Sequence, residues 1–238
     1  MRSFEHRIRP FETDIFGLAP PSMLLRLAVE AYMGQITAEN AEREKRRREL
    51  GAVWMLARLR LEQYKPIEIG DKLLIETSPG FVEGGTYVCT ADFSRGGDEV
   101  ASCQIATMAV LMSARRIIRP SVLGDFPDTP DNKKPASRLK KLRIDDDMEP
   151  IGSYKVRYSD CDLNGHLSGA NYADIICDCA GYWQAEPKLM AYLQIDYNSE
   201  CLPGELISLS RRREEEKTYI RGIKSDGVVS FASECIIR

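Results

Sequence analysis

Residues 59–71 read LRLEQYKPIEIGD, and 134 positions later residues 193–205 read LQIDYNSECLPGE. Both stretches begin with alternating apolar and polar residues, which is typical of a half-buried strand, and both end in a turn that contains glycine. Further upstream, residues 3–8 read SFEHRI, and 150 positions later residues 153–158 read SYKVRY. The repetition predicts that the chain of 238 residues is built from two copies of one unit.

A helical pattern lies between the two strand-like stretches of each copy. Apolar side chains recur at helical spacing between residues 23 and 31 in the first copy and over 169–185 in the second. The offsets 150 and 134 differ by 16, which places an insertion near residues 35–50, where charged turns extend the first helix. Strand-like segments follow at 71–79, 84–95 and 98–112 in the first copy and at 205–213, 217–224 and 228–238 in the second.

The order strand, long helix and several antiparallel strands predicts an α+β fold. It resembles the hotdog fold in two tandem copies, in which each unit is a long helix wrapped by an antiparallel sheet. Residues 119–150 are rich in Pro, Asp and Lys, which is typical of a linker. We therefore expect an N-terminal unit over residues 1–118, a linker over 119–150 and a C-terminal unit over 151–238.

Composition argues against several classes of protein. The net charge of −3 argues against a nucleic-acid partner. Seven cysteines are present without a CxxC pair, so we expect reduced thiols rather than a metal site. The N-terminus lacks the apolar core of a secretory signal, and no stretch approaches the roughly 18 apolar residues of a membrane span. These features predict a cytoplasmic protein with neither a cofactor nor a metal ion.

The second copy carries the residues that could perform chemistry. Residues 158–167 read YSDCDLNGHL, with Asp162, Asn164 and His166 at every second position. In an extended segment this spacing places the three side chains on one side. A helix is expected to begin near Gly169, where its N–H groups could stabilise an oxyanion. Another carboxylate, Glu200, stands just before the turn at residues 202–205, with Cys201 beside it.

The first copy serves as an internal control for these residues. The offset of 150 aligns Asp162, Asn164 and His166 with Glu12, Asp14 and Phe16, and the offset of 134 aligns Glu200 and Cys201 with Pro66 and Ile67. Because the base-like groups are missing there, the pattern favours one active site and one binding unit. A purely structural interpretation stays open, in which Asn164-Gly165 forms a turn that Asp162 caps and His166 is a buried imidazole.

The string SDCDLNGHL at residues 159–167 resembles the active-site segment of the acyl-ACP thioesterases. Residues 54–71, WMLARLRLEQYKPIEIGD, are similar to the first-repeat strand and turn of the same family. The resemblance covers nearly the whole chain and implies catalytic roles for Asp162, Asn164, His166 and Glu200, with Cys201 as a rival nucleophile. Residues 167–172 depart from the family, because LSGANY stands where Val-Asn-Asn and a tyrosine are usual. The lack of a plastid transit segment favours a bacterial member.

The resemblance implies hydrolysis of acyl-ACP thioesters to free fatty acid. In the expected mechanism Glu200, oriented with Asp162, activates a water, while Asn164 and His166 hold that water and the carbonyl. The alternatives are attack by Cys201, an acyl-CoA thioesterase on the same fold, and a non-catalytic acyl-binding protein.

The expected partner is acyl carrier protein, and the protein could also form a homodimer. Basic residues that could bind this acidic partner are Arg46, Arg47, Arg48, Lys133, Lys134, Lys140, Lys141, Arg143, Arg211, Arg212 and Arg213. Candidates for the acyl-chain site are Met23, Leu27, Met55, Leu56 and Met108.

Overall fold

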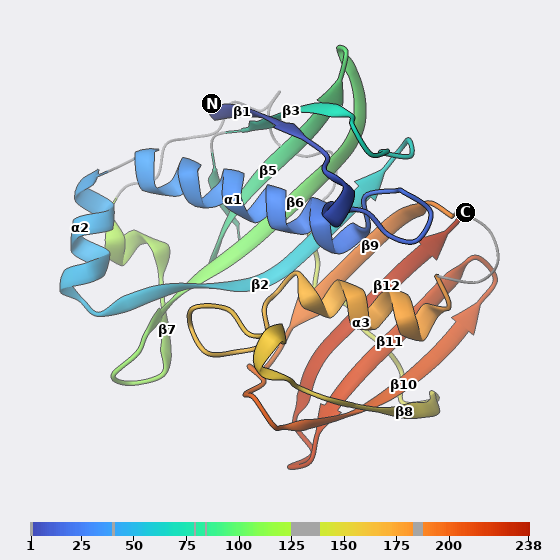
Figure 1. Cartoon of the computed structure of the whole chain (residues 1–238). Coiled ribbons are helices and arrows are strands. Elements are labelled where there is room, and N and C mark those ends of the chain that lie inside the picture. Colours follow the sequence, from blue (N-terminus) through green and yellow to red (C-terminus); the bar gives the residue numbers. More distant parts are fainter. Residues whose placement is uncertain (1, 40, 79, 84, 125–138, 183–187) are drawn as a thin grey trace.

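The computed structural model describes residues 2–39, 41–78, 80–83, 85–124, 139–182 and 188–238 (Figure 1). The elements of the first half are β1 (Arg2–Arg7), η1 (Pro10–Glu12), α1 (Pro21–Glu39), α2 (Ala41–Glu49), β2 (Ala52–Gln63), β3 (Lys72–Thr77), β4 (Phe81–Glu83), β5 (Thr86–Arg95), β6 (Asp98–Leu111), β7 (Arg116–Ile118) and η2 (Pro120–Leu123). Those of the second half are β8 (Glu149–Lys155), η4 (Tyr158–Asp160), α3 (Asn171–Ala180), β9 (Met190–Tyr197), β10 (Leu206–Glu214), β11 (Lys217–Lys224) and β12 (Val229–Ile237). The strands expected after each turn are therefore present.

The strands form one antiparallel sheet in the order β1-β3-β5-β6-β2-β9-β12-β11-β10-β8, with β4 on β5 and β7 on β6. Equivalent strands of the two halves lie at equal distances from the centre, where β2 pairs with β9. Arg60 faces Gln194 at that junction, and these residues are separated by the same 134 positions that relate the halves. A local two-fold axis therefore passes through this pair.

Backbone hydrogen bonds fix the true correspondence between the halves. Ile8 N–H donates to the Asp71 carbonyl, and Val156 N–H donates to the Glu205 carbonyl, both at 2.9 Å. The turns match as well, because Gly70 N–H donates to Ile8 as Gly204 N–H donates to Val156. The later offset of 134 is thus confirmed, but the upstream offset is 148, so the value of 150 was wrong by two residues.

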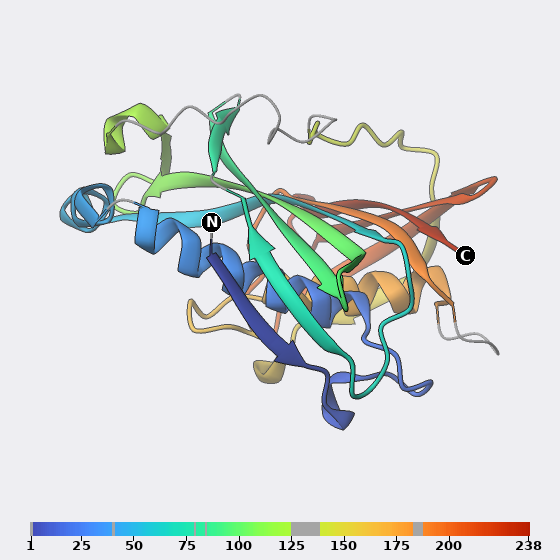
Figure 2. The same ribbon diagram turned by 90° about the horizontal axis from the view of Figure 1, so that it is seen from above.

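The two long helices lie on one face of the sheet (Figures 1 and 2). The first, α1, packs against β1, β3, β5 and β6, while α3 packs against β10 and β11. Their apolar residues join strand residues in one core that runs through both halves. The expected helix over 169–185 begins later and ends earlier, because Gly181 adopts a left-handed φ of 75° and its N–H caps the carbonyls of Cys177 and Asp178.

The described residues just before β8, from Leu139 onward, run on the opposite face of the sheet (Figure 2). Gln194 Nε2 donates to the Lys140 carbonyl at 2.7 Å, and Leu142 N–H donates to Asp196 Oδ2 at 2.7 Å. Both side chains project from β9 and are almost fully buried. Residues 139–142 are therefore fastened to the central strands beside the two-fold axis.

Candidate active site

The segment that carries His166 is a closed loop rather than the extended strand that period two predicted. Asp162 N–H donates to the His166 carbonyl at 2.9 Å, and Gly165 N–H donates back to Asp162 at 3.0 Å. The Asp162 carboxylate accepts the Asn164 N–H at 2.8 Å, and Gly165 has a φ of 80°. Asp and Asn-Gly favour such turns, and this local preference outweighs the alternating pattern.

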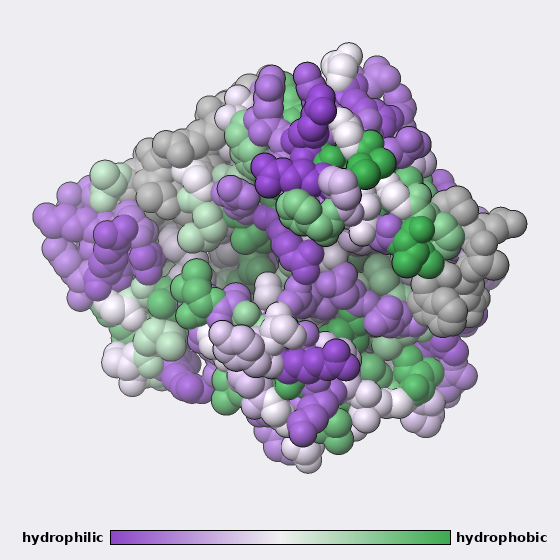
Figure 3. Space-filling model, in the orientation of Figure 1, coloured by the Kyte–Doolittle hydropathy of each residue, from purple (hydrophilic) through white to green (hydrophobic). Residues whose placement is uncertain are grey.

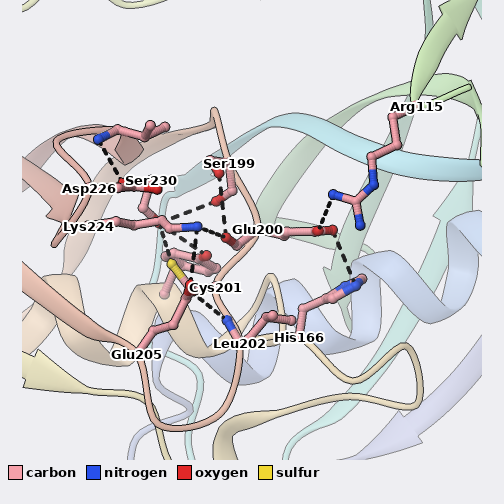
Figure 4. Close-up of polar contacts among 12 residues, drawn as sticks. Arg115, His166, Ser199, Glu200, Cys201, Leu202, Glu205, Lys224, Asp226 and Ser230 are labelled. Carbon is pink, nitrogen blue, oxygen red and sulfur yellow. Dashed lines mark hydrogen bonds and ion pairs between the residues drawn. The ribbon is translucent and has the colours of Figure 1, made fainter.

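His166 and Glu200 meet across the space between this loop and the end of β9 (Figure 4). His166 Nε2 lies 3.3 Å from Glu200 Oε2, and the side chains are 27% and 24% exposed. They are therefore reachable by solvent yet sheltered enough to interact strongly with a bound group. An imidazole and a carboxylate at this distance can share the handling of a proton between a water and a leaving group.

A third side chain at the site comes from the first half of the chain. Arg115 lies in the turn between β6 and β7, and its Nη1 is 3.3 Å from Glu200 Oε1 (Figure 4). Each carboxylate oxygen of Glu200 thus faces one basic side chain. The Arg115 side chain is 80% exposed. The sequence carries no local signal for Arg115, because its contact with Glu200 spans 85 positions.

The other predicted site residues do not reach this pair through any described contact. Asp162 and Asn164 are both exposed on the loop, where the Asp162 carboxylate holds the Asn164 backbone. Cys201 is 0% exposed, and its Sγ points away from His166 to lie 2.9 Å from Ser230 Oγ (Figure 4). In the structure His166 therefore contacts Glu200, whereas the thiol of Cys201 points into the core.

The corrected offset changes the comparison between the halves. Asp14 now corresponds to Asp162, and it makes the same bonds: its N–H donates to Leu18, and its carboxylate accepts the Phe16 N–H at 2.8 Å. Phe16 and Leu18 thus replace Asn164 and His166, while Pro66 replaces Glu200 as expected. The aspartate is common to both halves, whereas the amide, the imidazole and the glutamate belong to the second half alone.

A cation on the neighbouring hairpin is also shared by the halves. Lys224 Nζ donates to the Glu200 carbonyl at 3.3 Å and pairs with Glu205 at 3.3 Å. In the first half Arg95 donates to the Pro66 carbonyl at 3.2 Å and pairs with Asp71. Because both halves use this clamp, we assign it to the fold of the turn and not to chemistry.

Many of the basic residues predicted to dock a carrier protein are engaged within the molecule. Arg211 and Arg213 donate to the carbonyls at the C-terminus of α3, and Arg212 pairs with Asp145. Arg47 pairs with Glu44. Lys133 and Lys134 lie outside the described residues. The exposed candidates are Arg46, Arg48, Lys140, Lys141 and Arg143. Figure 3 shows hydrophilic side chains gathered over α2, which carries the first two.

The five residues expected to bind the acyl chain differ in how deeply they are buried. Leu27 is 2% exposed and packs in the core, whereas Met23, Met55, Leu56 and Met108 are partly buried. Leu56 of β2 lies against Gly169, where an added Cβ would come within 2.5 Å of Leu56 Cδ1. A first-half apolar side chain therefore adjoins the start of α3 in the second half.

Within the described parts of the chain, no group of three or more His, Cys, Asp or Glu side chains is placed to hold a metal ion. Among the described helices, none is long and apolar enough to cross a membrane.

Residues 144–230 match the family model of the acyl-ACP thioesterase C-terminal domain. This match places the similarity to acyl-ACP thioesterases in the C-terminal half, the half that carries His166 and Glu200. The resemblance seen in the sequence is thus confirmed, and with it the expected reaction class, hydrolysis of acyl-ACP thioesters. Comparison with curated protein sequences gave no match.

Solved structures show how far the thioesterase fold extends over the chain. An acyl-ACP thioesterase from Bacteroides thetaiotaomicron has 17% identity and a TM-score of 0.80, with 100% of this chain and 97% of that chain covered. A 12:0-ACP thioesterase from Umbellularia californica has 15% identity and a TM-score of 0.77, with 100% and 93% covered. A MaoC-like dehydratase from Phytophthora capsici, at 14% identity, has a TM-score of 0.51 over 78% of this chain and 72% of that one. Because the fold serves different reactions, the side chains of this chain must decide its mechanism.

Proposed function

We propose that this protein hydrolyses acyl-ACP thioesters with a water molecule that Glu200 activates. The observation that carries the mechanism is the 3.3 Å contact between His166 and Glu200, which the first half replaces with Leu18 and Pro66. Glu200 takes a proton from water as the oxygen attacks the thioester carbonyl carbon. Glu200 passes this proton to His166, the tetrahedral intermediate expels the thiolate, and His166 protonates that thiolate.

Asp162 and Asn164 act in this proposal through the loop that presents His166. Asp162 shapes the loop, as Asp14 does in the first half, and the exposed Asn164 amide orients the water or the carbonyl. The orienting role that the sequence suggested for Asp162 toward Glu200 is replaced by this indirect one. Support comes from the Asp162–Asn164 hydrogen bond, which occupies the carboxylate within its own loop.

The two halves have different roles in this proposal. We assign residues 151–238 to catalysis and residues 1–118 to acyl-chain binding, in two tandem hotdog units joined by residues 119–150. Leu56 beside Gly169 supports a chain-binding site between the halves, and Arg115 adds a first-half cation at Glu200. We also propose that the protein works in the cytoplasm and as a monomer, because one chain supplies both halves of the sheet and a homodimer is not needed to complete the site.

The acidic carrier protein docks, in our proposal, on the exposed basic side chains of α2. This helix packs against η2, which follows the β7 hairpin that carries Arg115. Replacing Lys45 and Arg46 by glutamine should raise KM for acyl-ACP but not for a small acyl thioester. The control removes two charges from the segment beside β9, with Lys140→Gln and Lys141→Gln. Equal effects of the two double variants would contradict this docking site.

The decisive experiment incubates the protein with acyl-ACP, acyl-CoA and small thioesters and identifies the freed acids. Faster release from acyl-ACP supports the proposal, and faster release from acyl-CoA would replace it with the CoA enzyme. Bound acyl chains without any free acid would identify a non-catalytic binding protein. Glu200→Gln provides the control, because it removes the proposed base while keeping the size of the side chain.

A further inference from the structure

A cluster of buried polar side chains lies behind Glu200 and is not used by the mechanism above. Ser230 Oγ on β12 lies 2.9 Å from Cys201 Sγ and 3.3 Å from the Tyr172 hydroxyl on α3. Tyr172 is 3% exposed, and the other two are 0% exposed. We call these three residues the Tyr-Ser-Cys cluster. It links a helix, a strand and the loop that carries the proposed base.

The first half shows that the fold does not require this cluster. By the offsets that the hydrogen bonds establish, Leu24 replaces Tyr172 and Ile67 replaces Cys201. Val100 replaces Ser230, because its carbonyl accepts Tyr64 and Lys65 N–H as the Ser230 carbonyl accepts Asn198 and Ser199 N–H. The three replacements are apolar and fully buried.

Burying polar groups where apolar ones fit is unfavourable for folding unless every group is satisfied. The cluster therefore needs a reason beyond packing. Burial raises the pKa of the Tyr172 hydroxyl, with the nearby thiol adding to the effect, so the phenol stays a neutral hydrogen-bonding group. The clamp formed by Lys224 makes a useful contrast, because its counterpart Arg95 keeps the same contacts in the half that lacks the base.

The contacts of the cluster converge on the chain around Glu200. Ser230 Oγ also donates to the Ser199 carbonyl at 3.4 Å, and Cys201 follows Glu200 directly (Figure 4). The cluster thus holds the residues on both sides of the glutamate to β12 and α3. Small errors in the position of a catalytic group can cost about 100-fold in rate. We propose that Tyr172, Ser230 and Cys201 are positioning residues that set the Glu200 carboxylate against His166.

This inference rests on the proposed role of Glu200, but its test has a readout that does not depend on catalysis. The chain has two histidines, so protein labelled with ¹⁵N-histidine gives imidazole signals from His166 and His6 alone. His6 pairs with Glu12 in the first half and serves as the internal control. A change in the position of Glu200 alters the surroundings of the His166 ring and leaves those of His6 unchanged.

The variants Ser230→Val and Ser230→Thr are nearly equal in shape and differ in the hydroxyl. Ser230→Val introduces the first-half residue and should shift the His166 signals and lower kcat by about 10-fold to 100-fold, with KM little changed. Ser230→Thr should keep both the signals and kcat close to those of the parent protein. Val100→Thr, the matching exchange in the first half, should leave kcat unchanged.

Unshifted His166 signals in a folded Ser230→Val protein would overturn the inference, as would equal kcat values for the valine and threonine variants. If Ser230→Val fails to fold, Cys201→Ala and Tyr172→Phe each remove one contact of Ser230 Oγ and should shift the same signals. If the parent protein releases no free acid, the proposed function fails, while the His166 signals still decide whether the cluster positions Glu200.

Discussion

Asp14 and Asp162 hold the same loop in the two halves, each through a carboxylate oxygen that accepts an N–H two residues later at 2.8 Å. The loops differ in what they present, because Leu18 stands in one where His166 stands in the other. A residue shared by both halves serves the fold, and a residue confined to one serves the reaction.

Replacing either aspartate by alanine should lower the free energy of unfolding by about 1 kcal/mol or more, because each loop loses at least one hydrogen bond from a backbone N–H to the carboxylate. Denaturant unfolding measures this cost. Asp162→Asn should retain most activity, since an amide oxygen also supports this type of turn. A folded Asp162→Asn protein that lost as much activity as Glu200→Gln would instead show a direct role for the Asp162 carboxylate in the reaction.

His166→Ala and Glu200→Gln should each lower kcat by about 10²–10⁴-fold, as expected for groups that transfer protons. Their effects should not multiply in the double variant, because the two side chains act as one unit. Steady-state rates on acyl-ACP provide the measurement. His6→Ala, which removes the other histidine, should leave kcat unchanged. Parent rates in either single variant would remove the assignment.

Cys201 should not form an acyl-enzyme, because its thiol is fully buried and faces Ser230 rather than His166. Mass spectrometry of protein quenched during turnover should show no acyl adduct. Cys201→Ala should keep at least about a tenth of the parent kcat, with the loss arising from a displaced Glu200. An adduct on Cys201, together with complete loss of activity in the alanine variant, would establish the nucleophile scheme.

Arg115→Gln should lower kcat on both acyl-ACP and a small thioester, because the guanidinium contacts Glu200 itself. An effect of at most about fivefold is expected, since an exposed ion pair contributes about 0–1 kcal/mol. Arg116→Gln, at the neighbouring exposed position, is the matched control. A loss seen on acyl-ACP alone, and abolished by salt, would assign Arg115 to docking.

Leu56→Trp should shorten the acyl chains that the protein accepts, because Leu56 lies where the two halves meet beside Gly169. Competition between thioesters of different length gives the ratio of kcat/KM values. Leu27→Met in the packed core should leave that ratio unchanged. An unchanged ratio for Leu56→Trp would place the acyl chain elsewhere.

The repeat and the strands could be predicted from local patterns, whereas the resemblance alone placed Glu200 in one site with His166. The alignment of the loops could not be predicted, because a shift of two residues leaves every side chain of a strand on the same face. The apolar pattern is therefore equally good at offsets of 148 and 150. Hydrogen bonds such as that from Asp14 to Phe16 distinguish the two, and they require coordinates.

The contacts of Arg115 and Ser230 were beyond prediction for a different reason. Each joins residues far apart in the chain, and neither arginine nor serine stands in a motif there. The closed loop at residues 161–167 was open to prediction, since Asn164-Gly165 is a strong turn signal. The extended interpretation was wrong, and the alternative turn at Asn164-Gly165 is the one that forms.

The pairing of Arg60 with Gln194 on the local axis shows what joining the two units in one chain makes available. In an assembly of identical subunits, a residue on the symmetry axis must face its own copy, so an arginine would oppose an arginine with like charge. Covalent fusion removes that requirement and allows a guanidinium to face an amide. The two units of one chain can also differ in sequence at the site. Here the second unit has the histidine and the glutamate and the first unit has neither, a difference that is impossible between identical subunits.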